Sequence, residues 1–271
     1  MKKITFIGAG NMAQSLIAGL IKDETSLSLC VADPMSSQLD IITNAWPEVV
    51  THCDNLQAIE NADVVILAVK PQLMEQVCEP LQDAVQQSQP LIISIAAGIT
   101  ESNLSAWLGG DLGVPVVRCM PNTPALVQAG ITGLYANKLV AEEQRNLAES
   151  ILRSVGSTIW FDDEAKLNAV TAVSGSGPAY FFLVMEAMQN AAEKLGLSSA
   201  DAQQLVLQTA FGAAKLALES SDTPAELRKK VTSKGGTTEA ALKELTQGGL
   251  IALFDTALSA AAQRSEELSS K

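Results

Sequence analysis

The sequence predicts two domains, an α/β domain at residues 1–160 followed by an all-α dimerisation domain at residues 161–271. Short β-prone runs alternate with helical periodicity as far as Trp160. Beyond Trp160 the alternation stops and long helical patterns follow. The chain is also long for one core, because single domains usually hold ~100 to 200 residues.

The first predicted element is a strand at residues 3–7, followed directly by a tight turn and a helix. Gly8 permits the turn, Gly10 lets a pyrophosphate approach the backbone, and Ala13 lets the helix pack closely on the strand. The Gly-x-Gly-x-x-Ala pattern is weak alone, but its place between a strand and a helix is typical of dinucleotide-binding loops. The predicted cofactor contacts here are Gly8, Gly10, Asn11, Met12 and Ala13.

The second predicted strand, Leu27–Ala32, ends at Asp33, near the ~20-residue interval expected for a group that contacts the adenosine ribose. A carboxylate there would accept a hydrogen bond from a 2′-hydroxyl and favour NAD. Ser36 and Ser37 could instead hydrogen-bond a 2′-phosphate and accommodate NADP. Asp33-Pro34 could also be a plain turn before a helix. These residues alone do not decide among an NAD contact, an NADP contact and a plain turn.

Further β-prone runs at residues 49–50, 63–69, 91–95 and 114–119 alternate with helical patterns that begin near Asn55 and Pro71. Parallel strands joined by helices form a Rossmann-type sheet, and a dinucleotide lies at the carboxyl edge of such a sheet. Polar or glycine-containing segments follow several of these strands. Each could be only a turn, but together they predict one cleft, with contacts from Ala68, Val69, Lys70, Pro71, Ala96, Met120, Asn122 and Thr123.

The C-terminal half contains helical patterns that are apolar all round. Pro178 is acceptable at a helix start, and the apolar-leaning residues 179–185 that follow leave no solvated face. A second helix at about 200–219 carries small residues, and the last begins near Leu250. Such helices need burial against more than their own domain, which predicts an intertwined homodimer. A compact monomeric bundle is the alternative.

The most distinctive stretch of this half is Gly235-Gly236-Thr237-Thr238, within a segment rich in Ala, Leu, Lys and Glu. The glycines end one helix, and the second can form the N-cap of the next. Free backbone N–H groups at a helix start, with two hydroxyls, suit a small carboxylate better than a phosphodiester or a metal. An ordinary capped turn is the alternative.

Composition excludes several function classes. The formal net charge is −12 and no basic run occurs, which argues against nucleic acid and anionic membranes as partners. The four cysteines lack a Cys-x-x-Cys spacing, and with the single His52 they give no metal or disulfide framework. No apolar segment approaches the ~20 residues of a membrane span, and no signal peptide is recognisable. We therefore expect a soluble cytoplasmic protein with a small-molecule partner and no metal.

The chain resembles the pyrroline-5-carboxylate reductases over nearly its whole length. Motifs occur in the order seen in that family, at residues 6–13, 68–72, 120–124, 174–180 and 233–238. The segment at residues 224–245 resembles the most specific motif of the family, whereas the glycine loop is shared by many dehydrogenases.

The resemblance implies NAD(P)H-dependent reduction of 1-pyrroline-5-carboxylate to L-proline, the last step of proline biosynthesis, with NADPH slightly favoured over NADH. It implies that the substrate binds the loop Ser233–Thr238. There the N–H groups of Gly236, Thr237 and Thr238 would hold the carboxylate. The Thr238 hydroxyl would meet the ring nitrogen as the catalytic group, and Ser233 would be a second contact, with Gly235 in the same loop.

For the cofactor, the resemblance implies that Asn55, Ala68 and Lys70 lie along it and that Met120 to Thr123 lie near the nicotinamide. It also implies an interlocked dimer that can assemble further into decamers. Two other functions stay open on the residues alone. One is another two-domain dehydrogenase of the 3-hydroxy acid type, which needs a lysine base that neither Lys166 nor Lys194 is placed to supply. The other is a non-catalytic NAD(P)-binding regulator.

Overall fold

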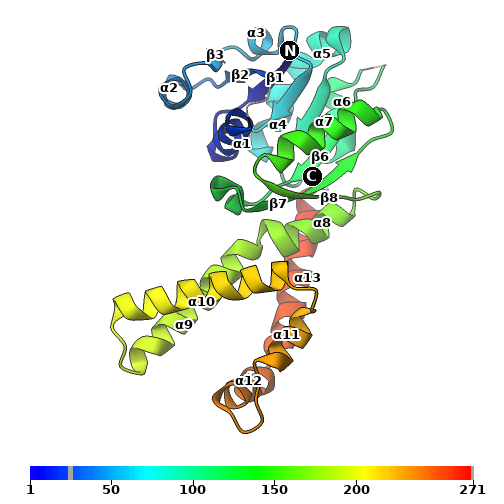
Figure 1. The fold of residues 1–271 in the computed structure, drawn as a ribbon. Helices are drawn as coiled ribbons and strands as arrows, with labels where there is room; N and C mark the ends of the chain where they lie inside the picture. The colour runs from blue at the N-terminus through cyan, green and yellow to red at the C-terminus, as the bar shows by residue number, and fades with distance from the viewer. Residues whose placement is uncertain (24–26, 111, 270–271) are drawn as a thin grey trace. The chain divides into compact units, whose positions relative to one another are not determined.

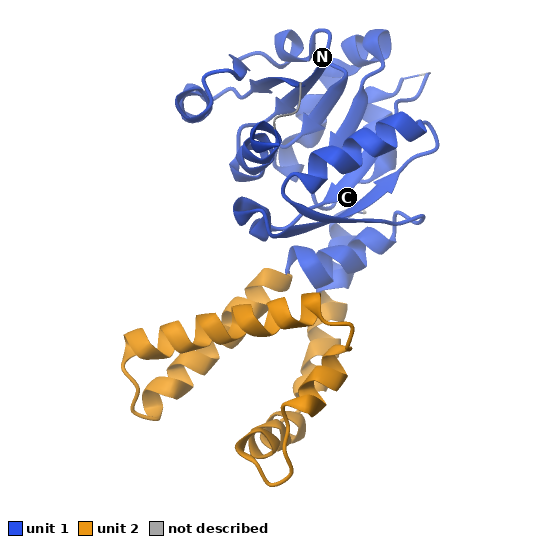
Figure 2. Cartoon of the chain, in the orientation of Figure 1, with its two compact units in different colours: residues 1–176, 261–271 blue, residues 177–260 orange. Residues whose placement is uncertain are grey.

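The structure is a computed structural model that describes residues 1–23, 27–110 and 112–269. Contacts divide the chain into two compact units, shown in Figure 2. Unit 1 comprises Met1–Ser176 and the chain from Ala261 onward, and unit 2 is Gly177–Ala260. The first unit extends beyond Trp160, the last residue of the predicted α/β domain, because the following residues bond to the sheet. The Phe161 N–H, for example, donates to the Leu134 carbonyl at 2.8 Å.

Unit 1 is built on one eight-stranded sheet with the order β3-β2-β1-β4-β5-β6-β7-β8 (Figure 1). The strands from β3 to β6 are parallel, β7 runs antiparallel to β6, and β8 runs parallel to β7. This confirms the predicted Rossmann-type architecture. The strands are β1 Lys2–Ile7, β2 Leu27–Ala32, β3 Val50–His52, β4 Val64–Leu67, β5 Leu91–Ser94, β6 Val116–Met120, β7 Gly130–Ala136 and β8 Gly156–Trp160.

Helices cover both faces of this sheet, so each central strand is buried on both sides (Figure 1). Along β1, Ile4 and Phe6 belong to one core, whereas Ile7 belongs to the core on the other face. The helices of unit 1 are α1 Asn11–Lys22, α2 Ser36–Ala45, α3 Asn55–Ile59, η1 Pro71–Leu73, α4 Met74–Cys78, η2 Glu79–Leu81, α5 Gln82–Ser88, α6 Glu101–Leu108, η3 Thr123–Val127, α7 Glu142–Arg153, α8 Lys166–Val170 and the π-helical turn η4 Thr171–Gly175.

The strand order reverses at β1, which pairs with β2 on one side and with β4 on the other. The chain leaves β1 at Gly8, whose N–H donates to the Ala32 carbonyl at 2.8 Å. On the opposite side, the Ala68 N–H donates to the Ile7 carbonyl at 2.8 Å. The ends of β1, β2 and β4 therefore meet at one place, where open parallel sheets bind their ligands.

The sequence prediction lacks several elements of unit 1, among them α6, β7, α7 and β8. Two glycines interrupt the β-prone residues of β7, and Gly156 adopts a φ of 152° at the start of β8. Glycine lowers the apparent strand propensity of both segments, so neither stands out as a strand.

Unit 2 consists of α9 Gly177–Lys194, α10 Ser199–Glu219, α11 Pro224–Lys230, α12 Thr237–Gln247 and the part of α13 Leu250–Ser269 up to Ala260. All of Gly177–Ala260 is described, and only Ala202 and Val206 among its apolar side chains are buried. Within the described ranges, one helical stretch, Lys166–Lys194, is long and apolar enough by length and composition to cross a membrane. No run of this kind was expected from the sequence.

Candidate functional site

The glycine loop after β1 leaves space for a ligand over Gly10. Gly8 has a φ of 103°, and a Cβ there would lie 2.7 Å from the Ala68 carbonyl oxygen, so the loop needs glycine at this position. A Cβ on Gly10, in contrast, would meet no other atom of the described chain within 4 Å. Gly10 is the N-cap of α1, and no described side chain caps that helix. The first N–H groups of α1 therefore face an open position suited to an anion.

Asp33, at the end of β2, bonds to the glycine loop. Its Oδ2 accepts from the Ala9 N–H at 2.9 Å, and its Oδ1 accepts from the Met35 N–H at 2.9 Å. Both carboxylate oxygens thus already hold a backbone donor. Ser36 and Ser37 follow at the exposed start of α2, where their hydroxyls bond to no described residue.

The predicted contacts after β4 lie at the same edge of the sheet. Ala68 and Val69 are half-buried, Lys70 is exposed, and Pro71 begins η1. Asn55 is half-buried as the first residue of α3, after the N-cap Asp54. After β5, Ala96 is buried, and its N–H donates to the Ser94 hydroxyl at 3.4 Å.

The loop after β6 is held by the side chain of Asn122, which is only 8% exposed. Its Oδ1 accepts from the Ile131 N–H at 3.0 Å, and its Nδ2 donates to the Ser174 carbonyl at 3.1 Å. Thr123 is exposed and Met120 is half-buried. Asn122 is predicted as a cofactor contact, yet its amide is engaged at both ends within the protein.

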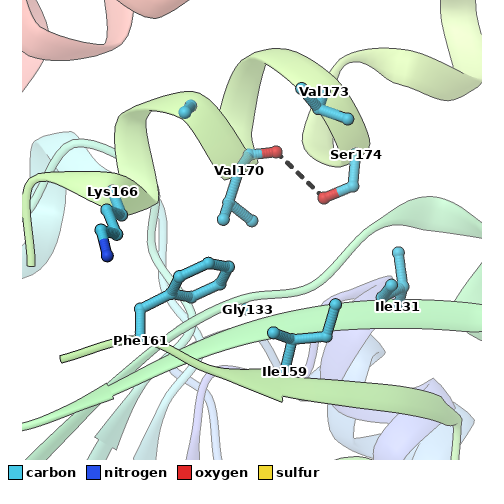
Figure 3. Close-up of a pocket in the computed structure, with 9 residues that line it drawn as sticks. Ile131, Gly133, Ile159, Phe161, Lys166, Val170, Val173 and Ser174 are labelled. Carbon is cyan, nitrogen blue, oxygen red and sulfur yellow. Dashed lines mark hydrogen bonds between the residues drawn. The ribbon is translucent and has the colours of Figure 1, made fainter. Parts of the chain in front are cut away.

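A cavity of about 360 Å³ lies beside this loop, between the sheet and the helical segment α8–η4 (Figure 3). Figure 3 shows Ile131, Ile159 and Phe161 on the sheet side, facing Val170 and Val173 on the helix. Its walls are almost wholly apolar. The Ser174 hydroxyl turns away to the Val170 carbonyl at 2.9 Å. The cavity therefore lacks the converging polar groups that a small polar substrate needs.

In unit 2, the predicted substrate loop joins α11 to α12 and begins α12 as the sequence predicts. Gly235 has a φ of 73°, and Gly236 is the N-cap of α12 without a side-chain cap among the described residues. The Gly235 N–H donates to the Glu239 carboxylate at 2.7 Å, so this N–H already has an acceptor.

The Gly236 N–H donates to the Ser233 carbonyl at 3.1 Å, whereas the hydroxyls of the loop are open. The hydroxyls of Ser233, Thr237 and Thr238 form no hydrogen bond to any other described residue. The first N–H groups of α12 lack intrahelical acceptors, as at any helix start. A small anion is the ligand that such an arrangement binds best.

Three of the four cysteines, Cys30, Cys78 and Cys119, are buried, and Cys53 is exposed. Among the residues that the structure describes, no group of three or more His, Cys, Asp or Glu side chains is placed to hold a metal ion. Burial raises the pKa of the Cys30 thiol, and it raises that of Cys78 to about 12. Burial raises the pKa of Cys119 as well, despite the nearby Arg118. Hydride transfer from a dinucleotide needs none of these groups.

A dinucleotide fits this edge of the sheet. The open position over Gly10, the uncapped start of α1 and the reversal of strand order at β1 are the features that hold a pyrophosphate in Rossmann-type folds. Gly8, Gly10 and Ala68 would border it closely because no larger side chain fills the space.

Two family models match the chain. Residues 3–98 match a model described as NADP oxidoreductase, coenzyme F420-dependent, and residues 164–268 match one described as pyrroline-5-carboxylate reductase dimerisation. The two matched segments correspond to the glycine-loop half of the sheet and to the helical half of the chain.

Whole-chain relatives agree with the second model. The pyrroline-5-carboxylate reductase of Pseudomonas aeruginosa is 53% identical over 267 residues, which cover 98% of this chain and 96% of the relative. The Haemophilus influenzae reductase is 44% identical over 269 residues, which cover 98% of this chain and 97% of the relative.

Solved structures show the same likeness. A pyrroline-5-carboxylate reductase from Coxiella burnetii has a TM-score of 0.92 and 48% identity, with 98% of both chains covered. A Plasmodium falciparum reductase solved with NADP bound has a TM-score of 0.85 and 27% identity. The match covers 99% of this chain and 98% of that reductase. The chain therefore belongs to the pyrroline-5-carboxylate reductase family and is an NAD(P)-dependent oxidoreductase of the last step of proline biosynthesis.

Proposed function

We propose that the substrate, 1-pyrroline-5-carboxylate, binds the loop Ser233–Thr238 and that Thr238 is the catalytic residue. The observation that carries this proposal is the uncapped start of α12, with three hydroxyls that bond to no described residue. The N–H groups of Thr237 and Thr238 hold the substrate carboxylate, aided by the helix dipole. The Gly236 N–H, which donates to the Ser233 carbonyl at 3.1 Å, joins them when it exchanges that acceptor for the substrate. The Thr238 hydroxyl hydrogen-bonds the ring nitrogen and fixes the orientation of the imine.

The cofactor lies along the carboxyl edge of the sheet in this proposal, over the glycine loop and beside Asn55, Lys70 and the loop Met120–Thr123. When bound, the reduced nicotinamide supplies the hydride. The protein's own contribution is to orient the two reactants and to exclude water, which accounts for catalysis without a histidine or metal.

Thr238→Ala tests the catalytic assignment. The kcat/KM for 1-pyrroline-5-carboxylate should fall about 10²-fold, whereas the Kd for NADPH stays near that of the wild type, because only the substrate contact is lost. Thr246→Ala is the matched control on the same helix, since the Thr246 hydroxyl donates to the Leu242 carbonyl at 2.8 Å. Equal activity of the two variants would refute the role of Thr238.

We propose NADPH as the preferred cofactor. Both oxygens of Asp33 accept backbone N–H groups, and the hydroxyls at the start of α2 can bond a 2′-phosphate. The double substitution Ser36→Ala with Ser37→Ala should raise the Kd for NADPH about tenfold and leave that for NADH unchanged. NADH serves as the control ligand on the same protein, and a parallel change for both cofactors would contradict the preference.

We propose an interlocked homodimer that assembles further into a decamer, and the apolar surface of unit 2 supports the dimer. Phe181, Phe182 and Leu183 are all more than half exposed at the start of α9, and Leu218 is 87% exposed on α10. Monomers rarely expose such contiguous apolar surface. Sedimentation should give a dimer or a higher multiple of it. Phe181→Asp with Leu183→Asp should release monomers; a monomeric wild type would end this proposal.

The proposed setting is the cytoplasm, with no nucleic acid or membrane partner. Its support is the net charge of −12, which repels both polyanions, and four free thiols, which suit a reducing compartment. The apolar helix Lys166–Lys194 is assigned here to subunit contact. Cell fractionation tests this assignment, because recovery of the protein in washed membranes would contradict it.

A further inference from the structure

The motif Ser174-Gly175-Ser176-Gly177-Pro178 has no role in the mechanism above, yet it contacts the loop after β6. Ser174 belongs to the π-helical turn η4, in which the Ser176 N–H donates to the Thr171 carbonyl at 2.8 Å. In a continuing helix, the Ser174 carbonyl would accept from the N–H of residue 178. Residue 178 is proline and has no N–H. The Ser174 carbonyl therefore needs another donor, and Asn122 Nδ2 supplies it at 3.1 Å.

A second contact joins the same two segments. A Cβ added to Gly175 would lie 2.5 Å from the Met120 Cε, closer than side chains pack. Gly175 therefore leaves the space that the end of the Met120 side chain occupies. Asn122 and Met120 thus both meet the π-helical turn, one through its amide and the other through its methyl group.

Elsewhere the turn packs unevenly, with Ala172 buried and other residues beside open space. The 360 Å³ cavity lies between the sheet and the residues of η4 and α8 (Figure 3). Val173, in the middle of the turn, is 59% exposed. Turns of the π type are rare and are found frequently at functional sites, where they place a group that a regular helix would misplace.

We propose that the π-helical turn Thr171–Gly175 positions the nicotinamide end of the cofactor site, with Asn122 and Gly175 as positioning residues that act through the loop Met120–Thr123. This rests on the proposed function, because that function puts the loop beside the nicotinamide. Asn122 then affects catalysis through the position of this loop and does not contact the cofactor itself. Its loss should misalign the reactants and leave the binding of the adenine and pyrophosphate intact.

Asn122→Asp is the direct test, because it keeps the acceptor for the Ile131 N–H and replaces the donor to Ser174 by an oxygen. The control is Asn137→Asp. Asn137 Nδ2 similarly donates to the Val114 carbonyl at 2.9 Å, but at the opposite edge of the sheet, since β7 is antiparallel to β6. Both variants should lower Tm. Only Asn122→Asp should lower kcat, by about 10- to 100-fold, with the Kd for NADPH within about threefold of the wild type.

Fluorescence of bound NADPH without substrate gives a readout that does not depend on turnover. Asn122→Asp should shift the emission of the bound nicotinamide, and Asn137→Asp should not. An unchanged emission together with a kcat equal to that of the control would overturn the proposal. Activity of the wild type and of Thr238→Ala tests the proposed function separately, so failure of one inference is distinguishable from failure of the other.

A double-mutant cycle tests the second contact. Gly175→Ala should displace Met120 and lower kcat, whereas Gly177→Ala should not, because a Cβ on Gly177 meets no described atom within 4 Å outside its own helix. In a Met120→Ala background, Gly175→Ala should have no further effect, since the displaced group is gone. If Gly175→Ala lowers kcat equally in the wild type and in the Met120→Ala variant, Gly175 does not act through Met120. That result would overturn the positioning role of Gly175.

Discussion

Asp33 Oδ2 accepts a hydrogen bond from the Ala9 N–H at 2.9 Å and thereby joins the end of β2 to the glycine loop. The same carboxylate accepts from the Met35 N–H at 2.9 Å. The residue thus fixes the backbone on both sides of the proposed adenosine site. A charged acceptor makes these bonds stronger than neutral ones.

Asp33→Asn should weaken the binding of NADPH and NADH alike, by about tenfold, because the amide can present only one acceptor to two N–H donors. Titrations of both cofactors measure this. Asp40→Asn is the control, an exposed acidic residue on the neighbouring helix α2. A loss confined to NADH would instead mean that Asp33 binds the ribose hydroxyl.

Gly10→Ala and Gly8→Ala should separate binding from stability. Alanine at residue 10 meets no described atom within 4 Å, so Tm should hold while the Kd for NADPH rises at least about tenfold, because the methyl group takes the place of the pyrophosphate. Alanine at residue 8 should cost about 2 kcal/mol or more, since φ is 103° and the Ala68 oxygen would lie at 2.7 Å. Thermal melts and cofactor titrations give both quantities. The idea fails if Gly10→Ala binds NADPH normally.

Glu164→Ala should destabilise unit 1 by about 3 kcal/mol. Glu164 Oε1 lies 2.6 Å from Arg118 Nη1 and also accepts from the Glu101 N–H at 2.6 Å. The Arg118 side chain is only 9% exposed, so removal of the carboxylate leaves a buried cation without its partner. Glu219→Ala, which breaks the exposed pair with Lys215, should cost less than about 0.5 kcal/mol. Urea unfolding compares the two, and similar losses would contradict this difference.

Cys53 should be the only one of the four thiols that reacts with a thiol reagent in the folded protein. Cys53 is exposed, whereas Cys30, Cys78 and Cys119 are buried. Burial raises the pKa of the buried thiols, to about 12 for Cys78, and the thiolate is the reactive form. Absorbance titration should count one thiol in buffer and four in denaturant. Rapid reaction of a second thiol in buffer would contradict the burial.

The raised pKa of the buried Cys78 thiol predicts how the free energy of unfolding depends on pH. An unfolded thiol ionises near its ordinary pKa of 9.0, whereas folded Cys78 keeps its proton to about 12. The unfolded chain therefore binds fewer protons in this window, and the free energy of unfolding should fall as the pH rises through it. The contribution is fully present below pH 9.0. Cys78→Ala should reduce the slope of this fall in urea unfolding experiments.

Local patterns were sufficient to predict β1, the glycine loop and the start of α12. An apolar run followed by Gly8 and Gly10 has few alternatives to a strand, turn and helix, and Gly235-Gly236 marks a helix boundary by conformational freedom alone. The strands β7 and β8 escaped prediction because their pairing is non-local and their glycines weaken the local signal.

The sequence by itself determined the strands from β1 to β6, the glycine loop, the apolar helices and the family, since all of these depend on residue types at fixed spacings. Only the tertiary structure decided that Asp33 holds Ala9 and that Asn122 supplies the donor missing at Pro178. Asn122 and Ser174 are 52 residues apart in the chain. A hydrogen bond between residues so far apart produces no periodic pattern in the sequence, because it depends on how the sheet and the helix pack together.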